Sequence, residues 1–201
     1  MNKRYICNLL RKRSGLIGGS GGYFFRSDFD YVAQGIVLEF VPRGLYVWNF
    51  IFPLFDFFGP HLSYSSRIAE RPFIGKDQMA DDDVIESILS SLELRNVLEA
   101  KSSMTLLEFA SFLETRDLRG AHAHINHAAT LALLGKKDLA LKLLKELAPA
   151  LDDHDLKLCD ALIVALNHGV EAVKSMLDVV KEENVKKLGG ADPSCGPARL
   201  P

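Results

Sequence analysis

The chain has 201 residues, of which 48% are hydrophobic and 25% are charged, and its formal net charge is -2 at pH 7. This composition is ordinary for a globular chain with a substantial core. A net charge so near zero gives no general attraction to polyanions, so we expect neither nucleic acid nor an acidic membrane as a partner.

Residues 1–75 are predicted to form a small antiparallel sheet with one amino-terminal helix. The helix is "KRYICNLLRKR", which gathers its apolar residues on one side. Segments rich in aromatic and β-branched residues follow, and each is typical of a strand. Their ranges are 23–28, 31–41, 45–55 and 61–69. The "PRG" at 42–44 predicts a hairpin between the second and third strands.

The third strand, 45–55, is apolar on both faces. The first face carries Tyr46, Trp48, Phe50, Phe52 and Leu54, and the second carries Leu45, Val47, Ile51 and Phe55. A strand with one face in water would alternate instead. We expect the amino-terminal helix to cover one face and either the later helices or another molecule to cover the other. Tyr46, Trp48, Phe50 and Phe52 are therefore the predicted partner-binding residues.

Residues 76–188 are predicted to be helical. The first helix begins in the acids that start at Asp81, and a later one opens with Thr105 and Glu108 at capping-box spacing. The acids between 77 and 99 and the basic residues between 3 and 13 are expected to be solvated faces that attract each other. Residues 189–201 have few apolar groups and are predicted to be a disordered tail.

An internal match at an offset of 32 residues lies in the helical region. It pairs Ala129 with Ala161, Leu134 with Leu166, Gly135 with Asn167, and Ala140 with Ala172. Gly and Asn suit the end of a helix, and Ala lets helices approach closely. Residues 121–185 therefore resemble two α-hairpins of the tetratricopeptide type, without that family's aromatic positions and proline. The family's peptide groove is not carried over to named residues.

Three histidines fall within six residues at the start of this repeat. His124 and His127 share a helix face and could grip a metal, but two ligands do not make a site. We expect partly exposed histidines and no metal, unless an acid from another helix completes the set.

Other catalytic or cofactor signals are weak. "GLIGGSGG" precedes a strand instead of a helix, which argues against both a phosphate loop and a Ser20 nucleophile. We expect no cofactor and no catalytic residue. His61, Tyr64 and Arg67 beside the sheet form an alternative small-anion pocket, with Tyr46 and Trp48 as further walls.

The cysteines and the apolar segments indicate the cellular compartment in which the chain is expected to function. Three isolated cysteines, an odd number, imply neither a disulfide framework nor a zinc site, and they fit a reducing cytoplasm. They are Cys7, Cys159 and Cys195. Asn8 breaks the apolar run that a signal peptide needs, and Pro53 and Asp56 interrupt the most apolar window, 45–59. We expect neither secretion nor a membrane span.

The preferred interpretation is a non-enzymatic, cytoplasmic protein-binding protein of α+β class, whose partner is another protein or a second copy. The chain opens its sheet region with "YFFR", continues with the aromatic strand "LYVWNFIFPLF" and ends in a helical half. In this order of segments it resembles uncharacterised bacterial proteins, some of the immunity type that neutralises toxins. The resemblance implies an immunity or antitoxin role. The alternative is a small-molecule-binding protein or enzyme with a pocket between sheet and helices.

Overall fold

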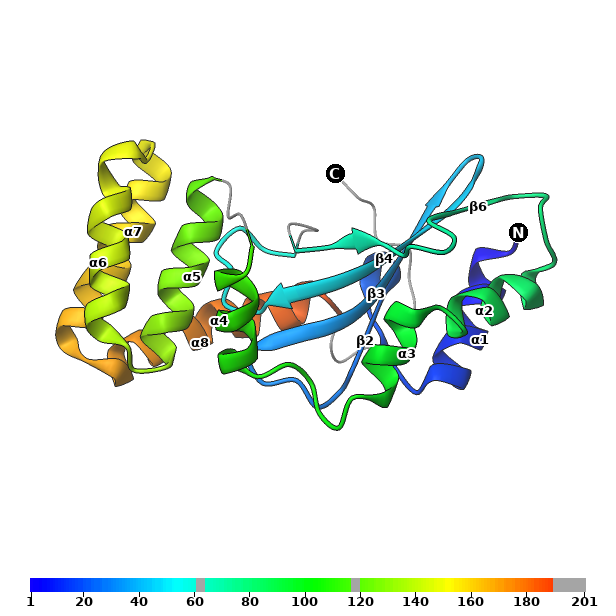
Figure 1. Cartoon of the computed structure of the whole chain (residues 1–201), viewed down its shortest axis with the longest axis horizontal. Coiled ribbons are helices and arrows are strands. Elements are labelled where there is room, and N and C mark those ends of the chain that lie inside the picture. The colour runs from blue at the N-terminus through cyan, green and yellow to red at the C-terminus, as the bar shows by residue number, and fades with distance from the viewer. Residues whose placement is uncertain (61–63, 117–119, 190–201) are drawn as a thin grey trace. The chain divides into compact units, whose positions relative to one another are not determined.

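The computed structural model describes residues 1–60, 64–116 and 120–189 and has the α+β fold that the sequence predicts (Figure 1). The chain divides into two units. The sheet unit comprises Met1–Phe52, Pro60–Ser103 and Val185–Pro201, and the helical unit comprises Pro53–Gly59 and Met104–Asn184. The division differs from the predicted boundary at residue 75, because two short helices after the strands belong with the sheet. Of the predicted tail 189–201, all but Gly189 lies outside the described residues.

The sheet unit begins with α1 (Lys3–Ser14), which matches the predicted helix. The Asn2 side chain accepts a hydrogen bond from the Tyr5 amide at the start of α1, and Gly15 ends the helix with a φ of 71°, in the left-handed region. Three basic residues occupy the last turn, where the helix dipole favours positive charge. Local capping signals therefore set both ends of this helix.

The described strands form one antiparallel sheet in the order β1-β2-β3-β4-β5, with β6 also paired to β4. Strands β3 and β4 are long and joined by a hairpin turn at 42–43, within the predicted 42–44. Strands β5 and β6 are short pieces that pair with different parts of β4. The bounds are β1 (Ile17–Gly18), β2 (Tyr23–Phe25), β3 (Val32–Val41), β4 (Gly44–Pro53), β5 (Ser66–Arg67) and β6 (Phe73–Gly75). Only the end of the predicted fourth strand, 61–69, is therefore a strand in the described residues.

One face of this sheet is the core of the sheet unit. Leu45 and Val47 of β4 lie there, fully buried, in a cluster with apolar residues of α1, α2 (Asp81–Leu89) and α3 (Leu92–Glu99). Figure 1 shows these three helices grouped together beside the strands. Burying the apolar side chains of this cluster stabilises the fold by roughly 25 cal/mol for each Å² of apolar surface removed from water. The predicted cover by the amino-terminal helix is thus present, and α2 and α3 share in it.

The oppositely charged helices α1 and α2 lie side by side. Arg13 forms an ion pair with Glu86, and the Tyr5 hydroxyl donates a hydrogen bond of 2.7 Å to Asp82. The backbone amide of Asn2 donates to the Asp81 carboxylate at 3.0 Å. These contacts confirm that the basic and acidic segments attract each other, and they satisfy charges that would otherwise face only water.

Arg26 ties the loop after β2 to the carboxyl end of α3. Its Nη1 donates to the carbonyl oxygens of Val97 and Ala100 at 2.8 and 2.9 Å, and its other nitrogens donate to both oxygens of Asp28. The Asp28 carboxylate also accepts from the Ser103 amide and hydroxyl. Hydrogen bonds from Arg26 first, and then from Ser103, hold the pKa of Asp28 well below its usual range.

The helical unit contains α4 (Leu106–Glu114) and a run of longer helices. Thr105 and Glu108 form the predicted capping box, with reciprocal bonds of 3.2 and 2.7 Å at the start of α4. The following helices are α5 (Ala121–Leu133), α6 (Lys137–Leu147), α7 (Asp153–His168) and α8 (Val170–Lys187). Helices α5, α6 and α7 pack on one another (Figure 1).

The two α-hairpins predicted from the internal match are realised unequally. Gly135, with a φ of 72°, ends α5 and allows α6 to fold back, as predicted. Its counterpart Asn167 lies inside α7, which ends two residues later at Gly169. Ala140 is fully buried, whereas Ala172 is half-buried and its neighbour Val173 takes the buried position. The matched positions therefore correspond only in part, and the α-hairpin repeat stays a prediction.

No helix in the described parts of the chain is long and apolar enough to cross a membrane.

Candidate functional site

The face of β4 opposite Leu45 and Val47 carries the predicted partner-binding aromatics, and they differ in burial along the strand. Tyr46 and Trp48 are half-buried and reach the surface, whereas Phe50 and Phe52 are 0% and 1% exposed. Tyr23 of β2 meets the Phe50 ring edge-on at a centroid distance of 5.3 Å. The surface end of this face is therefore at Tyr46 and Trp48.

The short edge strands complete this face from one side. Tyr46 pairs with Phe73 of β6, and their rings lie 4.7 Å apart. Trp48 pairs with Arg67 of β5, whose guanidinium lies 4.2 Å from the centroid of Tyr46 and 4.9 Å from that of Trp48. The exposed guanidinium is thus stacked on two aromatic rings.

Glu39 of β3 reaches the same face from the other side. Its Oε2 accepts a hydrogen bond of 2.9 Å from the indole Nε1 of Trp48. A tryptophan N–H needs a partner when the ring is partly buried, and this bond fixes the orientation of the indole. We name the set Glu39, Tyr46, Trp48, Arg67 and Phe73 the aromatic face. Sequence reasoning missed Glu39, because a single charge in an apolar strand reads as solvent-facing.

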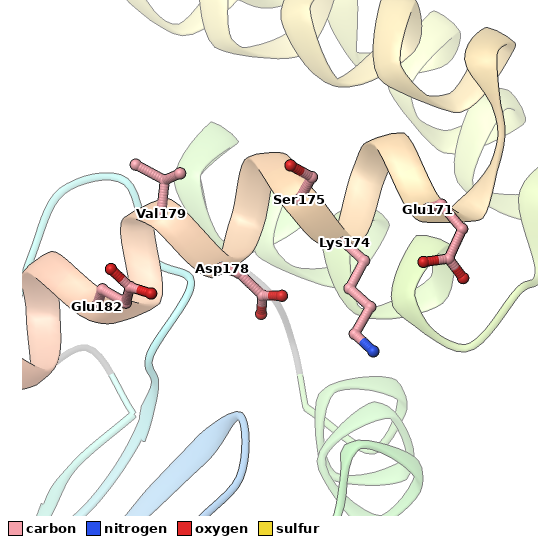
Figure 2. Close-up of a pocket in the computed structure, with 6 residues that line it drawn as sticks. All are labelled: Glu171, Lys174, Ser175, Asp178, Val179 and Glu182. Carbon is pink, nitrogen blue, oxygen red and sulfur yellow. The ribbon is translucent and has the colours of Figure 1, made fainter.

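The alternative pocket stays a prediction, because one of its residues lies outside the described residues. His61 lies outside the described residues, Tyr64 is half-buried, and Arg67 lies on the aromatic face. A hollow of about 460 Å³ lies along α8 (Figure 2). It is lined by Glu171, Lys174, Ser175, Asp178, Val179 and Glu182. All six residues come from one helix, so this hollow is an acidic surface groove with none of the converging groups that a catalytic pocket needs.

A buried polar network lies at Asp56 in the helical unit. Asp56 is 0% exposed, and each of its carboxylate oxygens lies 2.8 Å from Nε2 of His122 on α5. Asn126, one helical turn further along, donates to Asp56 at 2.8 Å, and the Phe58 amide donates at 3.0 Å. The amide nitrogen of Asn126 also lies 3.0 Å from Nε2 of His122, so the three side chains form one network.

Asn184 of α8 holds the same segment by its backbone. Its side-chain amide donates to the carbonyl oxygens of Leu54 and Asp56 at 2.8 and 2.7 Å, and Asn184 is 1% exposed. The Phe58 ring packs against His122 at 4.4 Å. A carboxylate and a histidine in contact can orient a general base. Here the hydrogen bonds to Asp56 and to its backbone fasten residues 53–59 to α5 and α8. The contact between Asp56 and His122 therefore has a structural role.

His124 and His127 lie on α5, and no third ligand groups with them among the residues that the structure describes. Nδ1 of His124 and Nε2 of His127 are buried atoms with no hydrogen-bond partner among the described residues. Burial lowers the pKa of His127, with the nearby Glu114 opposing the change and His124 and Lys136 adding to it. Glu114 on α4 is thus an acid from another helix, but it does not complete a three-ligand group with both histidines.

A different trio lies close enough to share a cation within the described ranges. The ligand atoms of Asp152, His154 and Asp155 lie within 4.8 Å of one another, mostly exposed, at the start of α7. Asp152 already accepts hydrogen bonds from the His154 and Asp155 amides as the helix cap. Capping therefore explains this cluster without a metal.

Comparison with protein-family models, with curated proteins and with solved structures finds no match to this chain. The aromatic face and the Asp56 network are therefore interpreted from their own geometry.

Proposed function

We propose that this chain is a cytoplasmic, non-enzymatic protein-binding protein that docks its partner on the aromatic face. The observation that carries the proposal is Trp48, a half-buried tryptophan that lies between the carboxylate of Glu39 and the guanidinium of Arg67. Binding energy at protein interfaces concentrates in Trp, Tyr and Arg, and this face presents all three together.

The support extends to the rest of the sheet. Because α1, α2 and α3 bury the opposite face, the fold already has its core, and the aromatic rings at Tyr46 and Trp48 are not needed to complete it. Such rings lose little conformational entropy on binding because they are held in place beforehand. Cys7 and Cys159 are buried as thiols, not as disulfides, which fits the reducing compartment that the proposal assumes. Neutralising a toxin would be one form of this binding.

The test is a selection of random peptides displayed on phage against the full chain. Selected peptides should lose binding to Tyr46→Ala and Trp48→Ala, with a loss of roughly 2 kcal/mol or more for a hot spot. Tyr5→Ala is the matched control, because Tyr5 is an exposed aromatic on α1, bonded to Asp82 and outside the aromatic face.

Folding is checked separately with Phe50→Ala. Phe50 is fully buried on the same face, so this variant should lose about 3–5 kcal/mol of stability, whereas Trp48→Ala should lose much less. Peptides that bind every variant alike would place the docking surface elsewhere and contradict the proposal.

A further inference from the structure

We infer that the partner seated on the aromatic face is a second copy of this chain, in a symmetric dimer. The inference rests on the proposed function and adds the identity of the partner. It is carried by the arrangement of two opposite charges around Trp48.

The two charges lie on opposite sides of β4. Glu39 comes from β3 and Arg67 from β5, and β4 lies between these strands in the sheet. Neither side chain forms an ion pair with any residue that the structure describes, although each contacts the Trp48 ring system. The face therefore presents one uncompensated anion and one uncompensated cation, separated by aromatic rings.

This pattern is complementary to itself. In an isologous contact, residue i of one copy meets residue j of the other, and j meets i. A two-fold axis that runs parallel to β4 between two facing sheets exchanges the β3 side of one copy with the β5 side of the other. Arg67 of each copy then stands across from Glu39 of the other copy, so one contact is made twice. Sheets that pack face to face keep their strands nearly aligned, which this axis allows.

The aromatic rings supply affinity and the charges supply register. Tyr46, Trp48 and Phe73 would be the apolar centre of the contact, where aromatic residues are enriched. The stacked guanidinium of Arg67 keeps its N–H edge available for a carboxylate, and the fixed geometry lowers the entropy lost on pairing. Charge pairs at an interface mainly exclude wrong partners and wrong registers, so removing them should be visible as lost specificity of assembly.

The experiment is sedimentation velocity of the full chain over a range of concentrations, with charge-reversal variants. We expect a reversible dimer, weakened at least about tenfold by Arg67→Glu or by Glu39→Arg, because each places like charges together. The double variant Glu39→Arg/Arg67→Glu restores the opposite pairs and should recover the dimer. Lys157→Glu, an exposed residue of α7 with the same change in charge, should leave the dimer intact.

Two further variants guard against a trivial loss of folding. Glu39→Gln keeps an acceptor for the Trp48 indole and removes the charge, so it should weaken the dimer less than Glu39→Arg does while keeping the native circular dichroism. Arg67→Gln removes the cation in the same conservative way and should act like Glu39→Gln.

Three results would overturn the inference. A wild-type chain that stays monomeric at all concentrations, while peptides from display bind in a Trp48-dependent way, would leave the proposed function standing with another partner. A monomer with no Trp48-dependent ligand would remove both. A dimer that both single reversals leave unchanged would place the self-contact on another surface.

Discussion

The carboxylate of Asp56, buried completely, lies 2.8 Å from the imidazole Nε2 of His122, although 66 residues separate them in the chain. With Asn126 and Asn184, this contact holds residues 53–59 in the helical unit. A buried carboxylate is costly unless it is paired and hydrogen-bonded, and here the imidazole, a side-chain amide and the Phe58 amide contact it. Removing the Asp56 carboxylate should therefore lower the free energy of unfolding.

The first prediction is that Asp56→Ala lowers the free energy of unfolding by about 2–4 kcal/mol, because the bonds that the carboxylate accepts from His122, Asn126 and the Phe58 amide would be lost. Urea denaturation followed by circular dichroism measures the change. Asp160→Ala, at an exposed position of α7, is the control and should cost little. Equal small losses in both variants would mean that the network does not fasten the segment.

The second prediction concerns His127, whose pKa is lowered mainly by burial. As pH falls, the unfolded chain takes up its proton before the folded chain does, so the free energy of unfolding should decrease from about pH 6.5 downward. The loss should level off below the folded-state pKa. His127→Gln should flatten this part of the profile, and an NMR titration of the ring should give a pKa below the ordinary value. A ring that titrates above 6.5 would contradict the burial argument.

The third prediction concerns acid. The pKa of Asp28 is lowered by Arg26 and Ser103, so the stability from this cluster is present above the ordinary carboxyl value of 3.8 and is lost as pH falls below it. Because Asp28 is partly exposed, its screened contribution should be only about 1 kcal/mol. Asp28→Asn should lose that amount at neutral pH and unfold with less dependence on acid. Thermal midpoints between about pH 6 and pH 2 measure both effects. Identical slopes in the two proteins would exclude Asp28 as their source.

The local features that the sequence predicted correctly each depend on a few neighbouring residues. The Thr105–Glu108 box, the turn at 42–44 and the glycine after α5 depend on contacts within a few positions, and all three are present. Asp56 could not be interpreted in this way, because its partners come from α5 and α8. Its place in an apolar window, together with the four-residue spacing of His122 and Asn126, was the available signal.

Burial along β4 was equally beyond the sequence. Tyr46, Trp48, Phe50 and Phe52 alternate identically, and nothing local separates the first two from the last two. The difference depends on neighbours from other strands: Tyr23 packs edge-on against the buried Phe50, whereas Phe73 and Arg67 lie beside the half-buried Tyr46 and Trp48. Likewise, the match of Ala140 with Ala172 gave no sign that the second α-hairpin turns at Gly169.

The fourth prediction tests that unequal repeat. Ala140→Leu should overpack the contact of α6 with its neighbours and cost about 1–3 kcal/mol, because Ala140 is fully buried. Ala172→Leu should cost clearly less, since this position is half-buried. Chemical denaturation of both variants gives the comparison. If Ala172→Leu proved the more damaging, the assignment of Val173 as the buried position of α8 would be wrong.

The central claim is that binding covers the aromatic face, and the emission of Trp48, the chain's single tryptophan, tests it most directly. The full chain, diluted until it is monomeric, is titrated with a fluorescently labelled peptide from the display selection, whose anisotropy reports binding independently. If the peptide docks on the aromatic face, Trp48 emission should shift to shorter wavelength and its quenching by acrylamide should fall, with the same midpoint as the anisotropy. Saturated binding with unchanged Trp48 emission and unchanged quenching would contradict the account.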